Sequence, residues 1–406
     1  MTLRGFTARL LLVVFATAIG LLLSEGAGRV VERIRCRELT GGWQVRAADY
    51  GWGNRPGAGG WGQRCLKGAV ESRAYTRINR HGLRDRELPY ERTTAYRILV
   101  LGDSFTLGMA VDQDQTFPKL LERRLNGAAP PGTHVEVLNA GVSAWGTDNE
   151  LLYYRTEGWR YRPDLVVLAF DTTNDVFENT RRLVASSAFW PDKPYFALDD
   201  GHLRLHHFPL PSPHPVRRAL TEVLAALERH SAAFRAASAL AVFQRFLLLP
   251  PPSPPPDLVP AASPFDVYLR DYPEAWREGW RITRGLVLRL RQEVEAHGGR
   301  FAVMVINARE EVAAPRWEVA RMVTPSLRSA PVDVDKPNRL ITQFLARRGI
   351  PAIPLLDAFR AEFGATNAIP GYFAWDIHWA PAGHALAARI LDERLHALHL
   401  VPDAPG

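Results

Sequence analysis

A serine stands directly after a short apolar segment, in a position where its hydroxyl could act as a nucleophile. Residues 96–101 read YRILVL, and Gly102, Asp103 and Ser104 follow at once. This pattern predicts a buried strand that enters a tight turn. Ligands of parallel sheets bind beyond the carboxyl ends of the strands, where Ser104 would be exposed. Gly-Asp-Ser also occurs in ordinary turns, so the tripeptide alone does not distinguish a turn from a catalytic site.

A base for this serine is offered near the carboxyl end of the chain, where Asp376 and His378 are separated by one residue. In an extended loop, side chains two positions apart project to the same side, so the carboxylate can approach one imidazole nitrogen. A nucleophilic serine needs such a base, and the base needs an orienting group. The alternative is an Asp–His pair in a surface loop. The other histidines lack this arrangement, and we expect His384 to pack or cap locally.

Two further turns offer hydrogen-bond donors for a developing oxyanion. Gly141 follows a second predicted strand, where the lack of a side chain lets a backbone N–H approach a substrate. Asn174 follows a third, and its side-chain amide could donate. Each residue also suits an ordinary turn. Their placement at successive strand ends favours a shared site.

The elements that must position these residues alternate between strands and helices. We predict strands over residues 96–101, 135–138, 165–170, 301–306 and 352–355, and helices over 117–125, 149–154, 276–297, 337–348 and 381–398. This alternation predicts an α/β fold, with a central parallel sheet covered by helices on both faces.

The amino-terminal segment, residues 1–28, is predicted to be a signal anchor or a cleaved signal peptide. Arg4 and Arg9 precede fourteen uncharged residues, 10–23. No clear small-residue cleavage site follows, which favours an anchor with the catalytic domain outside the cytoplasm. The anchored enzyme would face the periplasm or the exterior, and cleavage would make it a secreted protein.

The segment 29–92 is rich in Gly, Trp and Arg, shows little periodicity, and is interpreted as a juxtamembrane extension. It contains both cysteines, Cys36 and Cys65, which form either one disulfide or two free thiols. Residues 93–400 would form the main domain, with an insertion over 183–275. That insertion carries a helix-like stretch, 216–249, followed by a proline-rich break.

Composition is that of a globular protein, and it argues against nucleic acid as a partner. The 406 residues carry a formal net charge of +7. The excess comes from arginines spread along the chain, without a basic tail, stripe or nucleic-acid motif. No ligand-spaced cluster of His, Cys and Asp predicts a metal site, and no cofactor is expected.

Four blocks, RILVLGDSFT, VLNAGVSAWGT, PDLVVLAFDTTND and DIHWAPAGH, together resemble the SGNH (GDSL-type) hydrolases. Ser104, Gly141, Asn174 and His378 fall on the four residues that name this group, and Asp376 on the partner of the histidine. The resemblance implies a flavodoxin-like three-layer fold and an acyl-serine mechanism. It also implies an oxyanion hole formed by the N–H groups of Ser104 and Gly141 together with Asn174.

Two further blocks, INRHGLRD and KPYFALDDGHL, resemble a membrane-anchored bacterial subgroup that is often linked to surface polysaccharide. The sequence departs from the SGNH pattern at Thr172, where glycine is usual. Asp376 also stands two residues before His378, where many members have three. This Asp-x-His-Trp form is similar to alginate-type O-acetyltransferases.

These features predict a serine esterase that removes acyl groups, most simply acetyl, from a cell-envelope or extracellular glycan or another ester. The first alternative is an O-acetyltransferase that acts on an exported polysaccharide with the same three residues. The second is an inactive glycan-binding envelope protein. In that case Trp145, Trp375 and Trp379 could stack on sugars, although they could equally pack in the core.

Overall fold

The computed structural model of the chain describes residues 3–34, 39–40, 43–66, 69–91, 94–128, 130, 132–184, 193–212, 215–238, 259, 262–365, 369–374 and 376–402. The chain divides into two compact units. The larger unit comprises Trp43–Gly62, Ser72–Pro211 and Ser253–Gly406, and the smaller one Met1–Gly42, Gln63–Glu71 and Ser212–Pro252. The domain boundaries expected at residues 28 and 92 stay predictions.

The larger unit is built on a parallel sheet of five strands. They are β6 (Tyr96–Gly102), β7 (Val135–Gly141), β8 (Leu165–Asp171), β11 (Arg300–Ile306) and β12 (Ala352–Pro354). Their order across the sheet is β12-β11-β8-β6-β7, with every neighbouring pair parallel. β7 and β8 are buried along their whole length, as expected for strands covered on both faces. The predicted α/β fold is confirmed.

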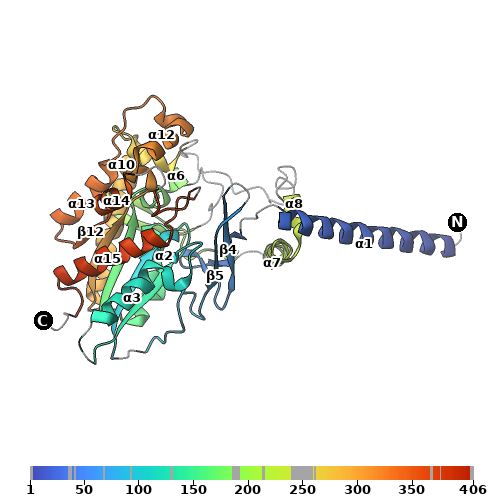
Figure 1. The fold of residues 1–406 in the computed structure, drawn as a ribbon, viewed down its shortest axis with the longest axis horizontal. Helices are drawn as coiled ribbons and strands as arrows, with labels where there is room; N and C mark the ends of the chain where they lie inside the picture. The colour runs from blue at the N-terminus through green and yellow to red at the C-terminus, as the bar shows by residue number, and fades with distance from the viewer. Residues whose placement is uncertain are drawn as a thin grey trace. The chain divides into compact units, whose positions relative to one another are not determined.

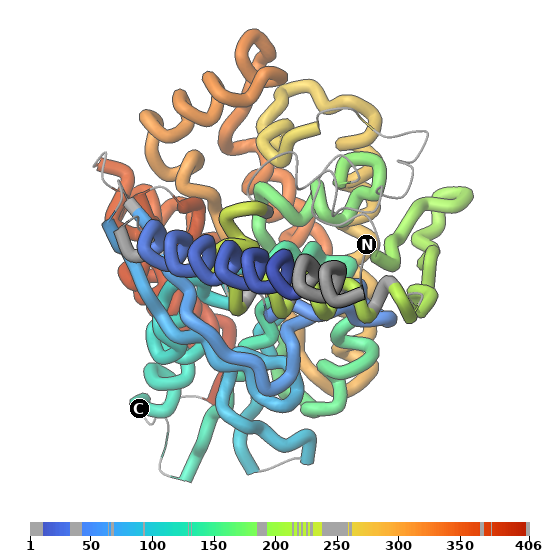
Figure 2. Tube along the Cα trace, turned by 90° about the vertical axis from the view of Figure 1, so that its right-hand side faces the viewer, coloured from blue at the N-terminus to red at the C-terminus, as the bar shows by residue number. Residues whose placement is uncertain are grey.

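Helices cover both faces of this sheet, which makes three layers. On one face lie α4 (Thr147–Thr156), α10 (Glu274–Ala296) and α13 (Lys336–Arg347). On the other lie α3 (Phe117–Ala128), α14 (Leu356–Phe363) and α15 (Pro381–Ala397). α3 and α15 run side by side, turquoise and red in Figures 1 and 2. The five predicted helices of this unit are therefore present, with ends shifted by a few residues.

The strand order reverses its direction of connection where the site was expected. β6 connects to β7 on one side, whereas β8 connects to β11 on the other. The loops that follow β6 and β8 therefore diverge, the arrangement at which ligands of open parallel sheets bind. Register places Gly102 beside Gly141, so three strand ends meet at one edge.

Short helices lie between these elements of the larger unit. They are α2 (Ser104–Leu107), α5 (Asp175–Glu178), α6 (Arg181–Val184), α11 (Arg309–Val312) and α12 (Ala314–Val323), with the 3₁₀ helices η1 (Gln113–Gln115), η2 (Gly158–Tyr161), η3 (Pro264–Tyr268) and η4 (Pro325–Leu327). A hairpin is formed by β9 (Tyr195–Asp199) and β10 (His202–His206), within the predicted insertion.

The amino-terminal helix α1 (Leu3–Ile34) is longer than the predicted apolar segment. Eighteen consecutive residues within Leu11–Glu32 have a mean hydropathy of 1.9, and the stretch is long and apolar enough to cross a membrane. Length and composition fit a signal anchor and a signal peptide equally.

The segment 29–92 contains strands despite its weak periodicity. They are β1 (Leu39–Thr40), β2 (Gln44–Ala47), β3 (Gly51–Asn54), β4 (Gly59–Leu66) and β5 (Ala69–Arg77). β2 and β3 are only four residues long. In β5 the buried positions are Ala74 and Thr76, whereas Tyr75 between them is exposed, so no clear alternation of apolar and polar residues marks the strand. Cys65 is disulfide-bonded, and Cys36 lies outside the described residues.

The helix expected over residues 216–249 is two helices in its described part, α7 (Pro215–His230) and α8 (Ala232–Ser238). Ser231 separates them, because its hydroxyl accepts the N–H of Phe234 at 3.0 Å and so caps α8. Residues 239–249 of that prediction, and the proline-rich break apart from Val259, lie outside the described residues.

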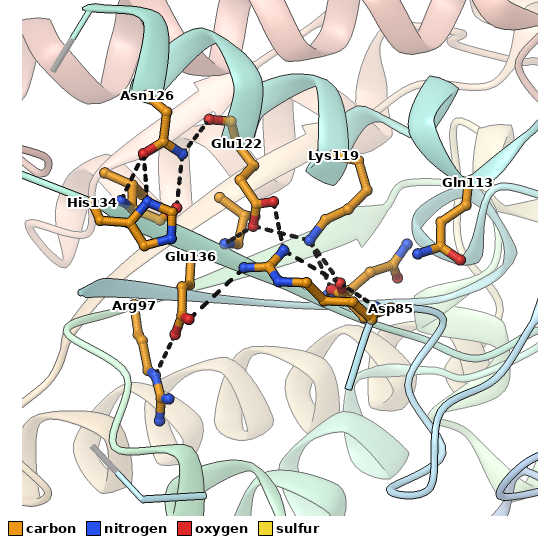
Figure 3. A network of polar contacts seen from close by, with 12 residues as sticks. Asp85, Arg97, Gln113, Lys119, Glu122, Asn126, His134 and Glu136 are labelled. Carbon is orange, nitrogen blue, oxygen red and sulfur yellow. Dashed lines mark hydrogen bonds and ion pairs between the residues drawn. The ribbon is translucent and has the colours of Figure 1, made fainter. Parts of the chain in front are cut away.

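A buried network of ion pairs ties the segment before β6 to α3 and β7 (Figure 3). Lys119 contacts Asp85 at 2.8 Å and Glu122 at 3.0 Å, and Asp85 also accepts the backbone N–H of Asn139. Burial raises the pKa of Asp85, and the charge of Lys119 opposes this rise. Each buried charge therefore depends on its partner.

We expect Asp85→Ala to lower the free energy of unfolding by about 3 kcal/mol, because it removes a partner of a buried lysine. The matched control is Arg80→Ala, which breaks an exposed pair with Glu87 and should cost less than about 1 kcal/mol. Urea unfolding followed by circular dichroism measures both. Equal losses in the two variants would contradict the role given to the network.

Candidate active site

Ser104 is the first residue of α2, at the turn that the sequence predicts after β6. Asp103 caps this helix, and its carboxylate accepts the N–H of Phe105 at 2.8 Å. Gly102 is needed at the strand end, since a Cβ there would overlap with the side chain of Thr106. Ser104 is buried, with 7% of its surface exposed, so it is less accessible than the sequence predicts.

The structure brings Ser104, His378 and Asp376 together. Nε2 of His378 lies 2.7 Å from Oγ of Ser104, and Nδ1 of the same ring contacts Oδ1 of Asp376. The backbone N–H of His378 also donates to Oδ1 of Asp376, at 2.8 Å. Asp376 and His378 therefore face the same way, as the sequence predicts. A local turn brings them together, and the hydrogen bond to the Asp376 carboxylate stabilises this turn.

The loop that carries this pair is fixed from several directions. Nη1 of Arg309 donates to the carbonyl of Asp376 at 3.0 Å, and the N–H of Phe373 donates to the carbonyl of His378 at 3.1 Å. Trp379, the next residue, is buried in the core beneath. These contacts hold the imidazole in place without using either of its ring nitrogens.

His384 is not part of this group of side chains. It is buried at the start of α15, where Nδ1 accepts the N–H of Phe117 at 3.2 Å. Burial, with smaller effects from Arg84 and His378, lowers the pKa of His384 to about 3. This ring is therefore neutral at physiological pH and packs locally, as expected.

Asn174 reaches the same edge from the end of β8. Its Nδ2 donates one hydrogen to Oδ2 of Asp103 at 2.8 Å, so a second amide hydrogen is left for a ligand. Its Oδ1 is buried and has no hydrogen-bond partner among the described residues. Asp103 thus links the serine turn to the asparagine turn, a shaping role that fits its complete burial.

Gly141 ends β7, as predicted, but its N–H donates to Oδ1 of Asn139 at 3.0 Å. This bond engages the donor that the sequence assigns to the oxyanion. A Cβ at Gly141 would overlap with the backbone of Leu107, so glycine is required here for α2 to lie against β7. Beyond it, the partly exposed Ala144 has a φ of 62°, a strained conformation of the kind that gathers at functional sites.

Arg84 supports the backbone after Ser104, and none of the catalytic motifs in the sequence contains it. It is fully buried, and its guanidinium donates to the carbonyls of Leu107, Gly108 and Val111, which follow the serine turn. Burial lowers the pKa of Arg84 to about 10. The available signal was the INRHGLRD block, in which this arginine stands.

Buried carboxyl groups lie behind the strand ends. Burial is the main cause that raises the pKa of Asp171 to about 8, and it raises the pKa of Glu150 and Asp175 well above the usual range. The charge of Asp103 acts on all three in the same direction. Because neutral carboxyls do not repel an oxyanion, their protonation suits a site where negative charge develops.

Trp145 and Trp379 pack in the hydrophobic core and are not available to stack on a sugar. Nε1 of Trp145 donates to the carbonyl of Trp52 at 2.9 Å. Trp375 lies outside the described residues. In the part of the chain that is described, no group of three or more His, Cys, Asp or Glu side chains could hold a metal ion.

Solved structures with some likeness to this chain include the following three. A catalytic mutant of Axe2, an acetylxylan esterase from Geobacillus stearothermophilus, is 14% identical, covers 74% of this chain and 94% of its own, and has a TM-score of 0.37. A GDSL-like lipase from Bacteroides thetaiotaomicron is 12% identical over 77% and 93%, with a TM-score of 0.36. TesA is 14% identical over 74% and 99%, with a TM-score of 0.38.

No curated protein matches the chain in sequence. The sequence model of the GDSL-like lipase/acylhydrolase family matches residues 100–303, which is half of the chain. The matched region begins in β6, contains Ser104, Gly141 and Asn174, and ends in β11. The chain therefore belongs to the GDSL-like lipase/acylhydrolase family and is a hydrolase that acts on ester bonds.

Proposed function

We propose that the protein is a serine esterase with Ser104 as nucleophile, His378 as general base and Asp376 as the group that orients it. The observation that carries this proposal is the position of the His378 imidazole, with Nε2 at 2.7 Å from the Ser104 hydroxyl and Nδ1 on the Asp376 carboxylate. This is the arrangement that activates a serine for acyl transfer.

In the first half of the reaction, Oγ of Ser104 attacks the ester carbonyl while Nε2 of His378 takes the hydroxyl proton. Asp376 holds the ring in the tautomer that leaves Nε2 free and stabilises the imidazolium that forms. As the tetrahedral intermediate collapses, Nε2 returns the proton to the leaving alkoxide. The products are a free alcohol and an acyl group on Ser104.

In the second half, Nε2 takes a proton from water, the resulting hydroxide attacks the acyl-serine carbonyl, and the proton passes to Oγ of Ser104 as the acid leaves. The N–H of Ser104 and the free Nδ2 hydrogen of Asn174 are proposed to stabilise the oxyanion in both halves. Gly141 was the third expected donor. Because its N–H is bonded to Asn139, we propose the strained Ala144 as the neighbouring donor on the same turn.

The proposed substrate is an acylated, most simply acetylated, glycan of the cell envelope or the exterior. Support comes from the apolar helix α1, which suits an anchor for a domain held outside the cytoplasm. The blocks at residues 78–85 and 193–203 add to it through their resemblance to a subgroup linked to surface polysaccharide. The hydrogen bonds between the three site side chains favour an enzyme over an inactive binding protein.

An O-acetyltransferase remains the second candidate, and one observation favours it. Ser104 and His378 are only 7% and 9% exposed. A transferase must keep water away from the acyl-enzyme and admit a sugar hydroxyl instead. The two reactions share the acyl-Ser104 intermediate and differ only in what resolves it.

We expect Ser104→Ala to lower aryl acetate hydrolysis by roughly four orders of magnitude, because the nucleophile is lost while the turn is kept. Ser143→Ala, two residues after the neighbouring strand β7, is the matched control and should keep its activity. Purified proteins with equal melting temperatures would be compared in a steady-state assay. Wild-type turnover by Ser104→Ala would contradict the assignment of Ser104 as the nucleophile.

Hydrolysis should fall toward acid pH, because protonated His378 cannot accept the serine proton. The low pKa of His384, about 3, means that this second buried ring does not titrate between about pH 5 and pH 8. His384→Gln should therefore keep the acid limb of the pH–rate profile, whereas Asp376→Asn should lower the rate about 10³-fold or more. A profile that is flat over this range would contradict the proposed base.

Acceptor dependence separates the two candidate reactions. The wild-type protein, supplied with an acetyl donor, should release acetate rapidly without any glycan if it is an esterase. Slow release that accelerates with added oligosaccharide, with acetyl appearing on the sugar, would show a transferase. Ser104→Ala provides the background in both arms.

A further inference from the structure

A groove with an arginine-rich lining runs along the outer side of α10 and α13, within the larger unit. Its volume is about 810 Å³, in the range of small-molecule sites. The hairpin β9–β10 forms one wall through Leu198, Gly201, His202 and Leu203. The lining contains Arg281, Arg284, Arg347 and Arg348, but only one acidic residue, Glu278.

The ion pairs of α10 show that one arginine is exceptional. The other arginines of this helix each pair with a glutamate: Arg277 and Arg281 with Glu274, Arg289 with Glu293, and Arg291 with Glu295. Glu278, the acid of the groove, pairs with Arg182. Arg284 alone on this helix is without a carboxylate partner in the described structure.

Arg284 is also the least hydrated of the groove arginines, being partly buried while Arg281, Arg347 and Arg348 are exposed. Its guanidinium lies 5.7 Å from the rings of both Trp280 and Phe344. Its Nε is buried without a hydrogen-bond partner among the residues described. Burial, and next the charge of Arg347, lower the pKa of Arg284.

This arrangement is costly for the protein by itself. A partly buried cation that faces another cation loses hydration and gains only aromatic contacts. The position of Arg347 has a structural explanation, since it stands in the last turn of α13 and meets the negative end of the helix. That explanation does not apply to Arg284, in the middle of α10. An anion in the groove would compensate both charges.

We propose that this groove binds the carboxylate or phosphate group of an acidic oligosaccharide, with Arg284 and Arg347 as the main ligands of the anion. Guanidinium groups recognise both anions through paired hydrogen bonds. The anion binding does not depend on the catalytic assignment, whereas the carbohydrate part of the proposal rests on the proposed function.

A second hollow of about 490 Å³ continues the groove along α10 and shares His202, Leu203, Gly285 and Leu288 with it. The arginines of this second part, Arg155 and Arg289, share one carboxylate, Glu293. In the described chain, the groove arginines that form no ion pair with a carboxylate, Arg284, Arg347 and Arg348, therefore all lie in the larger hollow, at one end. A chain with an acidic sugar at that end and uncharged sugars along α10 would match this distribution.

The test is a binding titration of the full-length protein in detergent, carrying Ser104→Ala so that no ligand is consumed. The probes are trigalacturonate, its methyl ester and glucose 1-phosphate, so that the uronate and phosphate sources are separated. We expect the trigalacturonate or the glucose 1-phosphate to bind, with an affinity that falls as salt is added, and the ester not to bind. Equal binding of the acid and the ester, or no binding of either anion, would overturn the proposal.

Arg284→Gln should weaken binding of the anionic probe about tenfold or more, since it removes a charge-assisted contact. Arg347→Gln is the second variant, and its exposed position makes misfolding no concern. Arg277→Gln, on the same helix but outside the groove, is the matched control and should change affinity less than about twofold. An equal loss in Arg277→Gln would show nonspecific attraction and refute the site.

Aryl acetate hydrolysis, measured with Ser104 intact, distinguishes this inference from the proposed function. Arg284→Gln should keep that activity, because the groove is not part of the catalytic group. A wild-type protein that binds the anion but does not hydrolyse aryl acetate would count against the esterase and leave the groove standing. A protein that hydrolyses aryl acetate but does not bind the anion would support the esterase and refute the anion site in the groove.

Discussion

The pairing of β6 with β7 on one side and with β8 on the other is the constraint on which the site depends. Buried strands are fixed in register because a slip of one residue would exchange the faces of the sheet. With register fixed, Gly102 lies beside Gly141, and the turns after β6 and β8 open at one edge. The place of the site follows from the strand order, because the connections from these two neighbours leave in opposite directions.

Polar groups that need not touch a substrate maintain this edge. Arg84 gathers three carbonyls of the chain after Ser104, and Asp103 joins the serine turn to Asn174. Burying such groups is costly, and their hydrogen bonds offset the cost only when the surrounding backbone is in place. The same low dielectric keeps the neighbouring carboxyl of Asp171 protonated, since burial raises its pKa to about 8. Burial in a low dielectric is thus the common cause of the hydrogen bonds that support the site and of the raised pKa of its neighbouring carboxyl.

Two places in the larger unit contain charged side chains that are at least partly buried, and these side chains differ in their ion pairs. Around Lys119 each cation is matched by a carboxylate, so the network serves stability (Figure 3). At Arg284 the described part of the chain supplies no acid, although the other arginines of α10 each pair with one. A fold gains nothing from leaving one partly buried guanidinium uncompensated beside a second cation. This contrast is the reason to regard the groove as a place for a ligand.

The sequence by itself determined the five strands, the alternation that makes the sheet parallel, and the residues at the strand ends. Apolar runs and turn residues are local signals, and the spacing of Asp376 and His378 already aims both side chains one way. It did not reveal β2 to β5. β2 and β3 are only four residues long, and the buried positions of β5 are the small Ala74 and the polar Thr76, so no apolar period of two appears in the sequence.

Only the tertiary structure decided which groups meet. It placed His378 at 2.7 Å from Ser104, across 274 residues of chain, and it engaged the N–H of Gly141 with Asn139. It also buried Arg84 against three carbonyls and left Arg284 without an acid in the described chain. Hydrogen bonds and desolvation depend on distances between segments remote in sequence, and packing of the sheet and its helices sets those distances.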